Sequence, residues 1–367
     1  MMHHPADSDE IPPPDPVHYA EQALLGALLF NPRQLHRANN LLPGHFADPA
    51  HRALYAAMRT LIPPPPEVHR REPVWVNAVL AHAVVDAPGL TVAHAHALVD
   101  ACPNPAHVGA YALMIRAGHL RRTLREPAQR LAQTATDSTL PDPTTTVLEE
   151  AGALARLLDQ LAVHWRPHTG ALPRTSIPAA APRAATADER EEERLFLAAS
   201  TAQPHALRTL PTHLQPEDFT DPLHQQLYRC LTALAHRSGP IDPVTVLWEA
   251  QHRGLLAHRH TPPDIVAAVS DPAGSAEHWA EQIPQRALLA RAQATASIIA
   301  TLTDDPTNTP HQLINRARHA LSDFITQHTR RRGRPPSAPA TRELRARPPS
   351  PPRATIPGEQ ILRRSSR

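Results

Sequence analysis

The chain contains two copies of one pattern, and this internal duplication limits its possible folds more than any other feature of the sequence. Residues 46–55 and 219–228 are identical at six of ten positions, at an offset of 173. Shorter matches occur in the same order on both sides of this pair. They align Glu21 with Glu193, Leu25 with Leu197, Pro32 with Pro204, Pro73-Val74 with Pro243-Val244, Val76 with Val246, and Asp142-Pro143-Thr144 with Asp305-Pro306-Thr307. An ordered series of this kind predicts two tandem domains of the same fold.

The apolar residues of each copy recur at the spacing of an α-helix. Residues 54–61 carry apolar side chains at positions i, i+3, i+4 and i+7, and residues 227–234 repeat this stripe. An Asp-Pro pair precedes both stripes, where it supplies a capping carboxylate and a proline at the first helical position. These patterns predict an all-α fold with a compact helical core in each copy.

Each copy ends in two longer apolar stretches separated by a turn. They lie within about 108–163 in the first copy and about 276–328 in the second, and the Asp-Pro-Thr matches mark the two turns. A long helix, a turn and a second helix predict an antiparallel helical hairpin in each copy. Pro127 and Pro284 lie within the leading stretches. Because proline lacks a backbone N–H, a kink or a delayed helix start is expected there.

Proline also marks the parts of the chain outside the two copies. The 43 prolines among 367 residues are more than twice the usual share of roughly 5%. Segments rich in proline and polar residues bury too little apolar area to offset the entropy lost on ordering. The sequence therefore predicts a disordered N-terminus at 1–16, a first domain at 17–166, a Pro/Ala-rich linker at 167–189, a second domain at 190–329 and a disordered tail at 330–367.

The chain contains no lysine, so all of its basic residues are arginines. A Walker A loop needs a lysine that reaches the terminal phosphates, and Schiff-base chemistry needs a lysine amine. The two glycines nearest to each other, Gly109 and Gly118, are also too far apart for a glycine-rich phosphate loop. These absences exclude an ATP-driven motor and predict a chain without enzymatic activity or cofactor.

Other absences bear on disulfides and on localisation. Cys102 and Cys230 are too few for a disulfide framework or a Cys-based zinc site, so buried free thiols are expected. The first residues lack the apolar core of a signal peptide, and no uninterrupted apolar run of 18 residues occurs. A cytoplasmic protein that does not contact membranes is therefore expected.

The ordered motifs resemble those of a known family. The segment Glu21-Gln22-Ala23-Leu24-Leu25-Gly26, the element Phe46-x-Asp48-x-x-His51-x-x-Leu54-Tyr55 and the helical hairpin are similar to the N-terminal domain of the bacterial replicative helicase DnaB family. In the second copy, Pro216-Glu217-Asp218-Phe219 and Ile241-Asp242-Pro243-Val244-Thr245 resemble two further segments of that domain. The resemblance covers nearly all of both copies and does not extend into the tail.

The resemblance implies interaction rather than catalysis. In that family the domain pairs through its hairpin, forms the collar of a hexameric ring and presents a surface to primase, while the ATPase is a separate domain. It therefore implies a non-enzymatic, replication-associated protein that contacts a replicative helicase or primase. It also implies that the two hairpins of this chain pair with each other and that several chains can assemble. The candidate pairing residues are Leu154, Leu157, Leu158, Leu161, Leu313, Ala317, Leu321 and Phe324.

Histidines and aspartates raise the question of a chemical site. Asp48 and His51, like their counterparts in the second copy, could form an acid–base pair, but a helix cap and a first-turn histidine explain the same residues without catalysis. The chain has 25 histidines, and His94 and His96 have the spacing of metal ligands, yet no such pair recurs between the copies. We therefore expect a helix cap and solvated histidines, with no catalytic and no metal site.

Charge is distributed unevenly along the chain. Residues 330–367 hold 11 arginines and two acidic residues, whereas residues 1–329 hold 26 arginines and 33 acidic residues. Such a basic tail is typical of binding to phosphate backbones, and a solubilising tail is the simpler alternative. The second functional interpretation is thus a DNA- or RNA-binding protein whose helical domains serve dimerisation. The candidate contacts are Arg330, Arg331, Arg332, Arg334, Arg363 and Arg364. Arg121, Arg122 and Arg125 are instead expected on a solvated helix face.

Overall fold

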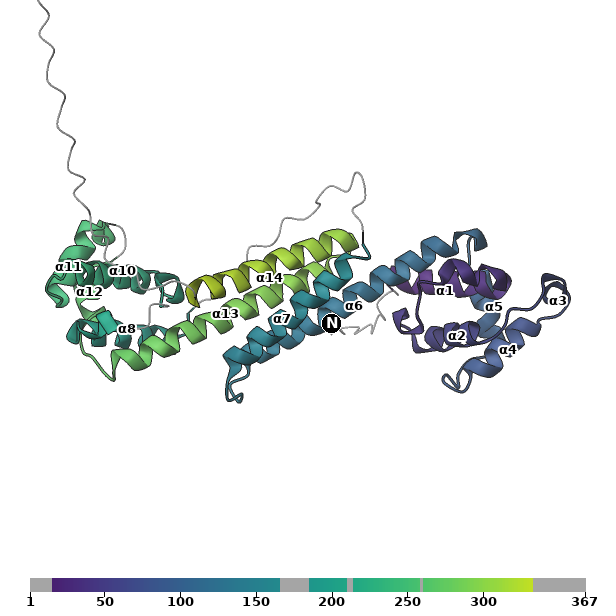
Figure 1. The fold of residues 1–367 in the computed structure, drawn as a ribbon, viewed down its shortest axis with the longest axis horizontal. Helices are drawn as coiled ribbons and strands as arrows, with labels where there is room; N and C mark the ends of the chain where they lie inside the picture. The colour runs from purple at the N-terminus through teal and green to yellow at the C-terminus, as the bar shows by residue number, and fades with distance from the viewer. Residues whose placement is uncertain (1–14, 166–184, 210–213, 258–259, 333–367) are drawn as a thin grey trace, which may run out of the picture.

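In a computed structural model the chain forms an elongated helical molecule (Figure 1). The structure describes residues 15–165, 185–209, 214–257 and 260–332. These residues form helices and no strand, so the predicted all-α class is confirmed. Each copy contributes a compact head, and the two heads lie at opposite ends of a central group of long helices (Figure 1). Among the described helices, none combines the length and the apolar character needed to cross a membrane.

Head 1 consists of the short helices that precede the first hairpin. They are α1 (Pro16–Phe30), α2 (Pro49–Thr60), α3 (Pro66–Arg71), α4 (Val74–Ala83) and α5 (Val92–Asp100), with 3₁₀ segments at Pro32–Ala38, Pro43–His45 and Pro105–His107. Helix α1 is central, since residues 23–29 are all buried. Phe46, Tyr55 and Trp75 fill the space around it, and the indole N–H of Trp75 donates to the backbone oxygen of Leu28 at 3.2 Å.

Head 2 repeats this arrangement with a shorter set of elements. They are α8 (Ala187–Ala202), α9 (Ala206–Thr209), α10 (Pro222–His236), α11 (Pro243–His252) and α12 (Pro262–Ala268), with 3₁₀ segments at Pro216–Asp218 and Leu255–Ala257. Helix α8 begins inside the stretch 167–189 that was expected to be linker. The reason is a capping box, in which the N–H of Glu189 donates to the hydroxyl of Thr186 at 3.1 Å and the N–H of Thr186 donates to the Glu189 carboxylate at 2.9 Å.

The two predicted hairpins are present. The first consists of α6 (Val108–Thr136) and α7 (Pro143–Ala162), and the second of α13 (Ala276–Asp304) and α14 (Pro310–Arg332). Helices α6 and α13 have 29 residues each and continue through Pro127 and Pro284. The delayed helix start considered for these prolines therefore does not occur.

The turns of the two hairpins align differently from the sequence match. Asp142 caps the start of α7, whereas Asp305 follows the end of α13 and accepts from the N–H and hydroxyl of Thr307 at 2.9 and 2.6 Å. The counterpart of Asp305 is Asp137, which accepts from the N–H and hydroxyl of Thr139 at 2.8 and 2.6 Å. The predicted pairing of Asp142 with Asp305 is therefore wrong by five residues, because an Asp-x-Thr motif occurs at both ends of the first turn.

Candidate functional site: the paired hairpins

Helices α6, α7, α13 and α14 pack into one four-helix unit, which we call the hairpin bundle (Figure 1). Helices α6 and α13 start at opposite heads, so they run antiparallel past each other (Figure 1). A single apolar core joins the two hairpins. From the first hairpin it contains Leu120, Leu124, Ala128, Leu131, Ala135, Val147, Ala151, Leu154 and Leu158, and from the second Leu288, Ala292, Ala296, Ile299, Leu302, Leu313, Ile314, Ala317, Leu321 and Phe324.

The structure places all eight predicted pairing residues in or beside this core. Six of them are at most 4% exposed, namely Leu154, Leu158, Leu313, Ala317, Leu321 and Phe324. Leu157 and Leu161 are half-buried and pack against the core from its edge. Residues from hairpins about 160 positions apart in the sequence thus cover each other within one chain.

The two long helices bury the same face. Buried positions of α6 and α13 correspond at a constant offset of 168, as in Ile115 and Ile283, Leu120 and Leu288, Ala128 and Ala296, and Leu131 and Ile299. Two equivalent surfaces that contact each other in antiparallel orientation form a self-complementary interface, as in a two-fold symmetric dimer. The hairpin bundle therefore has the geometry of a dimer interface whose two partners belong to one chain.

Arg121 of α6 links the two hairpins through polar contacts. Its guanidinium donates to the backbone oxygens of Thr303, Asp305, Pro306 and Asn308, at 3.1, 2.7, 3.1 and 2.5 Å. These oxygens belong to the end of α13 and the turn that follows it. A cation there satisfies carbonyl groups that lack a partner within the helix and interacts favourably with the helix dipole. The expected solvated position is therefore wrong for Arg121.

The two neighbouring arginines differ from each other. Arg122 is half-buried and donates to the backbone oxygen of His45 at 2.6 Å, so the expected solvated position is wrong for it as well. Arg125 is exposed and forms an ion pair with Asp304 at 3.1 Å. Of the three arginines, only Arg125 lies on a solvated face, and it also reaches the second hairpin.

His45 lies where head 1 meets α6. Its ring centroid is 4.5 Å from that of His119. Burial, followed by the charges of His119 and nearby arginines, lowers the pKa of His45 to about 4. The counterpart in head 2 is Asp218, which pairs with Arg291 at 2.9 Å. Equivalent positions thus carry a histidine in one head and a carboxylate in the other.

A buried carboxylate–histidine pair stands at the same place in each head. Glu21 contacts His51, and Glu193 contacts His224, in both cases at 2.9 Å between a carboxylate oxygen and Nδ1. Both glutamates are fully buried. Each also accepts from a backbone N–H, Glu21 from Ala47 just before α2 at 2.6 Å and Glu193 from Thr220 just before α10 at 2.7 Å. The pairs join the first helix of each head to the helix that contains the histidine. Sequence reasoning aligned the two glutamates but did not assign them these partners.

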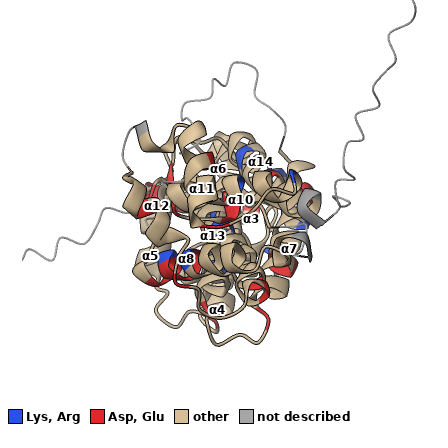
Figure 2. Ribbon diagram, turned by 90° about the vertical axis from the view of Figure 1, so that its left-hand side faces the viewer, with Lys and Arg blue, Asp and Glu red and all other residues tan. Residues whose placement is uncertain are grey.

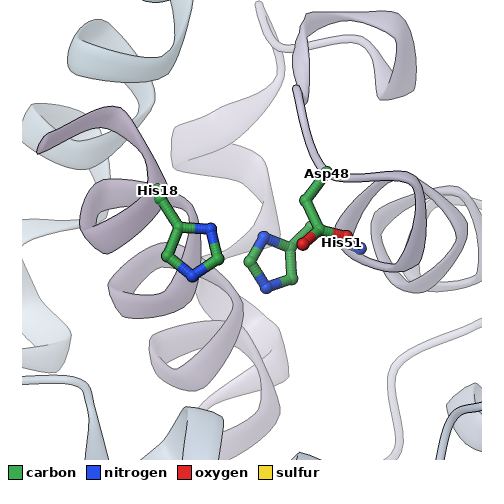
Figure 3. A group of neighbouring side chains, drawn as sticks. All are labelled: His18, Asp48 and His51. Carbon is green, nitrogen blue, oxygen red and sulfur yellow. Dashed lines mark hydrogen bonds between the residues drawn. The ribbon is translucent and has the colours of Figure 1, made fainter. Parts of the chain in front are cut away.

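Asp48 caps α2, as the Asp-Pro pair predicted. Its carboxylate accepts from the N–H groups of Ala50 and His51 at 2.7 and 3.2 Å. His18, from the first turn of α1, lies beside Asp48 and His51 (Figure 3). Sequence reasoning did not single out His18, because it precedes the first aligned residue of the repeat.

The arginines proposed to bind nucleic acid fall into two groups. Arg330, Arg331 and Arg332 are the last residues of α14, so the helix extends into the predicted tail. The others, Arg334, Arg363 and Arg364, lie outside the described residues. On the helices that the structure describes, acidic and basic residues are interspersed (Figure 2).

The two cysteines are both free thiols. Cys230 is buried, as expected, whereas Cys102 is only half-buried. Burial raises the pKa of the Cys230 thiol to about 11, which keeps it protonated and unreactive near neutral pH.

Comparisons with known proteins agree with the duplication. The family described as DnaB-like helicase N terminal domain matches residues 14–117 and again residues 186–285, together more than half of the chain. The chain is also similar to the replicative DNA helicase DnaC of Bacillus subtilis (strain 168), with 33% identity over 113 residues. This match covers 30% of the chain and spans only 25% of the length of that relative. No solved structure matches the chain.

Proposed function

The chain belongs to the DnaB-like helicase N-terminal domain family, and on this basis we propose that it is a non-enzymatic interaction protein of DNA replication that contacts a replicative helicase or a primase. The hairpin bundle is the observation that carries the proposal. It covers the hairpin of each copy with that of the other, and it holds the two heads apart at the ends of the molecule (Figure 1).

Two observations support a role without catalysis. Both family matches fall in the N-terminal domain of the helicase family. The sequence also lacks lysine altogether, and a Walker A phosphate loop requires one. The chain would therefore act by binding, and a role in replication would place it in the cytoplasm.

We treat one chain as a covalent equivalent of two paired collar domains. Because the bundle core is shared between the copies, a second chain is not needed to cover either hairpin. One chain could then bind to a helicase collar as a unit, and three chains would supply the six heads of a complete collar.

An exposed apolar position recurs in both heads and offers a contact point for a partner. Val74, at the start of α4, is 43% exposed, and its counterpart Val244, at the start of α11, is 70% exposed. Exposed apolar side chains at equivalent positions contribute little to either core. A partner that recognises both heads in the same way would cover these two valines.

The proposal is tested with the purified chain, the replicative helicase and the primase of its host, by size-exclusion chromatography with light scattering. We expect a stable complex with one of the two proteins. Combined Val74→Asp and Val244→Asp substitutions should weaken it at least about tenfold, equivalent to about 1.4 kcal/mol. Val85→Asp is the matched control, because Val85 is a 79% exposed valine of head 1 that lies outside the segment 73–76 shared by the two copies. No complex with either protein would refute the proposal.

Binding of DNA or RNA through the tail is a second candidate function, favoured by the 11 arginines and two acidic residues of 330–367. About five engaged phosphates give a log–log salt dependence with a slope of about −4 to −5 on duplex DNA. Removing residues 333–367 leaves α14 intact and should flatten this slope. Further substitution of Arg330, Arg331 and Arg332 by glutamine should flatten it more. A slope that survives both changes would contradict this function.

A further inference from the structure

We propose that His18, Asp48 and His51 form a binding site in head 1 for a divalent transition-metal ion of the zinc type (Figure 3). Each residue offers one ligating atom, and these atoms lie within 4.8 Å of one another. Around tetrahedral zinc, with bonds of about 2.0–2.2 Å, ligand atoms are separated by roughly 3.4 Å. His18 and Asp48 are only half-buried, so side-chain rotation can close this difference, whereas His51 is 1% exposed and provides the fixed ligand.

The contact of His51 with Glu21 leaves one ring nitrogen available to a metal ion. A carboxylate can only accept a hydrogen bond, so the contact of 2.9 Å between Nδ1 of His51 and Oε2 of Glu21 places the ring proton on Nδ1. The lone pair of the neutral ring is then on Nε2. A histidine whose second nitrogen donates to a carboxylate is the usual outer arrangement of a metal site, because it fixes both tautomer and ring orientation.

Asp48 and His18 each use one side-chain atom in a hydrogen bond and have a second atom available to a metal ion. Asp48 uses Oδ1 to cap α2, which leaves Oδ2. The side-chain nitrogen of Gln22 lies 3.0 Å from Nε2 of His18, which leaves Nδ1. Two nitrogens and one carboxylate oxygen suit zinc, cobalt or nickel, and not magnesium or calcium, which prefer oxygen ligands throughout.

His94 offers a further ligating nitrogen near this site. The ring centroid of His94 lies 6.2 Å from that of His51. Nε2 of His94 is buried and has no hydrogen-bond partner among the described residues. A bound ion would join the first turn of α1 to the start of α2, and so stabilise head 1.

Head 2 provides an internal control for this inference. It retains the carboxylate–histidine pair Glu193 and His224 and the capping Asp221. At the position of His18 it has Arg190, whose guanidinium cannot ligate a metal. The site is therefore a property of head 1 alone, and the chain should bind one ion rather than two.

Isothermal titration of the metal-free full chain with Zn²⁺, and the visible absorption of tetrahedral Co²⁺, test the proposal. We expect one tight site per chain and a rise in the thermal unfolding temperature on binding. His18→Ala and Asp48→Asn should each lower the affinity at least about tenfold, and Asp48→Asn keeps an oxygen that caps α2. His96→Ala, an exposed histidine of the same head, is the matched control and should change nothing. Circular dichroism establishes that each variant is folded.

Two further variants make the test decisive. Arg190→His should create the missing ligand in head 2 and raise the stoichiometry from one to two. His3→Ala with His4→Ala removes another histidine pair of the sequence and should leave the tight site intact. The proposal is overturned if tight binding is absent, if it survives His18→Ala, or if it disappears with His3 and His4.

Discussion

Substitution of Arg121 by alanine should separate the contribution of the bundle interface from that of the heads. The Arg121 guanidinium is half-buried, and all four of its backbone acceptors belong to the other hairpin, at residues 303–308. The substitution removes a cross-hairpin contact without changing any residue of the apolar core. Arg125→Ala is the matched control, because Arg125 lies one turn further along α6 and pairs with Asp304 while both side chains are more than half exposed.

The expected magnitudes follow from burial and geometry. A hydrogen bond to a charged group contributes about 1.5–3 kcal/mol to stability, and a cation at a helix C-terminus contributes up to about 2 kcal/mol. These contributions are not additive, since water can reach some of the four oxygens once Arg121 is removed. We therefore expect Arg121→Ala to lower the free energy of unfolding by about 2–4 kcal/mol. An exposed ion pair contributes about 0–1 kcal/mol, which sets the expectation for Arg125→Ala.

Urea denaturation followed by circular dichroism measures the first effect. A second readout tests the hairpin interface itself: a specific protease site inserted between residues 174 and 175 allows the chain to be cut between the copies. The two fragments of the otherwise unchanged protein should elute together, because the bundle core is shared. Arg121→Ala should weaken their association by about 30-fold or more, the equivalent of about 2 kcal/mol. If Arg121→Ala and Arg125→Ala have equal effects in both assays, the contacts of Arg121 do not hold the hairpins together.

Three other predictions, two of them with a matched control, concern the packing and the pH dependence. Gly26→Ala should lower the free energy of unfolding by about 3 kcal/mol or more, because a Cβ atom would lie 2.0 Å from the backbone oxygen of Leu98. Gly109→Ala is the matched control, since nothing lies within 4 Å of a Cβ atom there. In urea denaturation it should be neutral or slightly stabilising. Leu158 is fully buried in the bundle, so Leu158→Ala should lower the free energy of unfolding by about 2–5 kcal/mol. Leu157→Ala, at a half-buried neighbouring position, should lower it by less than half as much in the same urea denaturation. The pKa of His45, lowered to about 4 from 6.5, means that the unfolded chain binds more protons between these values. Stability should therefore fall by about 2 kcal/mol as the pH drops from 6.5 to 4, and urea midpoints of His45→Asn should show less of this decrease.

The helices could be predicted because their signals are local. Apolar periodicity and Asp-Pro caps lie within a few residues of the structure that they specify, and the repeat provided a second example of each. The hairpin turns were predicted in the wrong register for the same reason. Asp137 and Asp142 both belong to plausible turn motifs. Asp137 is the counterpart of Asp305, because each directly follows its long helix and accepts from a threonine two residues later, whereas Asp142 begins the next helix.

The polar contacts between distant segments could not be predicted in this way. Arg121 binds backbone oxygens more than 180 positions away, and a backbone oxygen has no side-chain identity that a sequence pattern could reveal. His51 and Glu21 are 30 residues apart on different helices. Their recurrence as His224 and Glu193 was a usable signal, since a glutamate and a histidine that reappear together in an apolar context suggest a buried pair.

At some pairs of contacting positions, both residues differ between the two copies. Gly118 lies against Val17, where a Cβ atom would be 2.7 Å from the valine side chain. In head 2 the same two positions hold Arg286 and Glu189, which form an ion pair at 3.8 Å. Arg286 also pairs with Glu192 and with the fully buried Glu193. A glycine at position 286 would remove the cation beside Glu193, and an arginine at position 118 would meet Val17 in place of a carboxylate, so a mixture of the two arrangements is unfavourable. The coupled difference therefore indicates that each head has kept a complementary interior of its own. The heads also differ where each meets its long helix, because His45 contacts Arg122 and His119 of α6 whereas the buried Asp218 pairs with Arg291 of α13. The two joints between head and bundle are therefore held by different polar contacts.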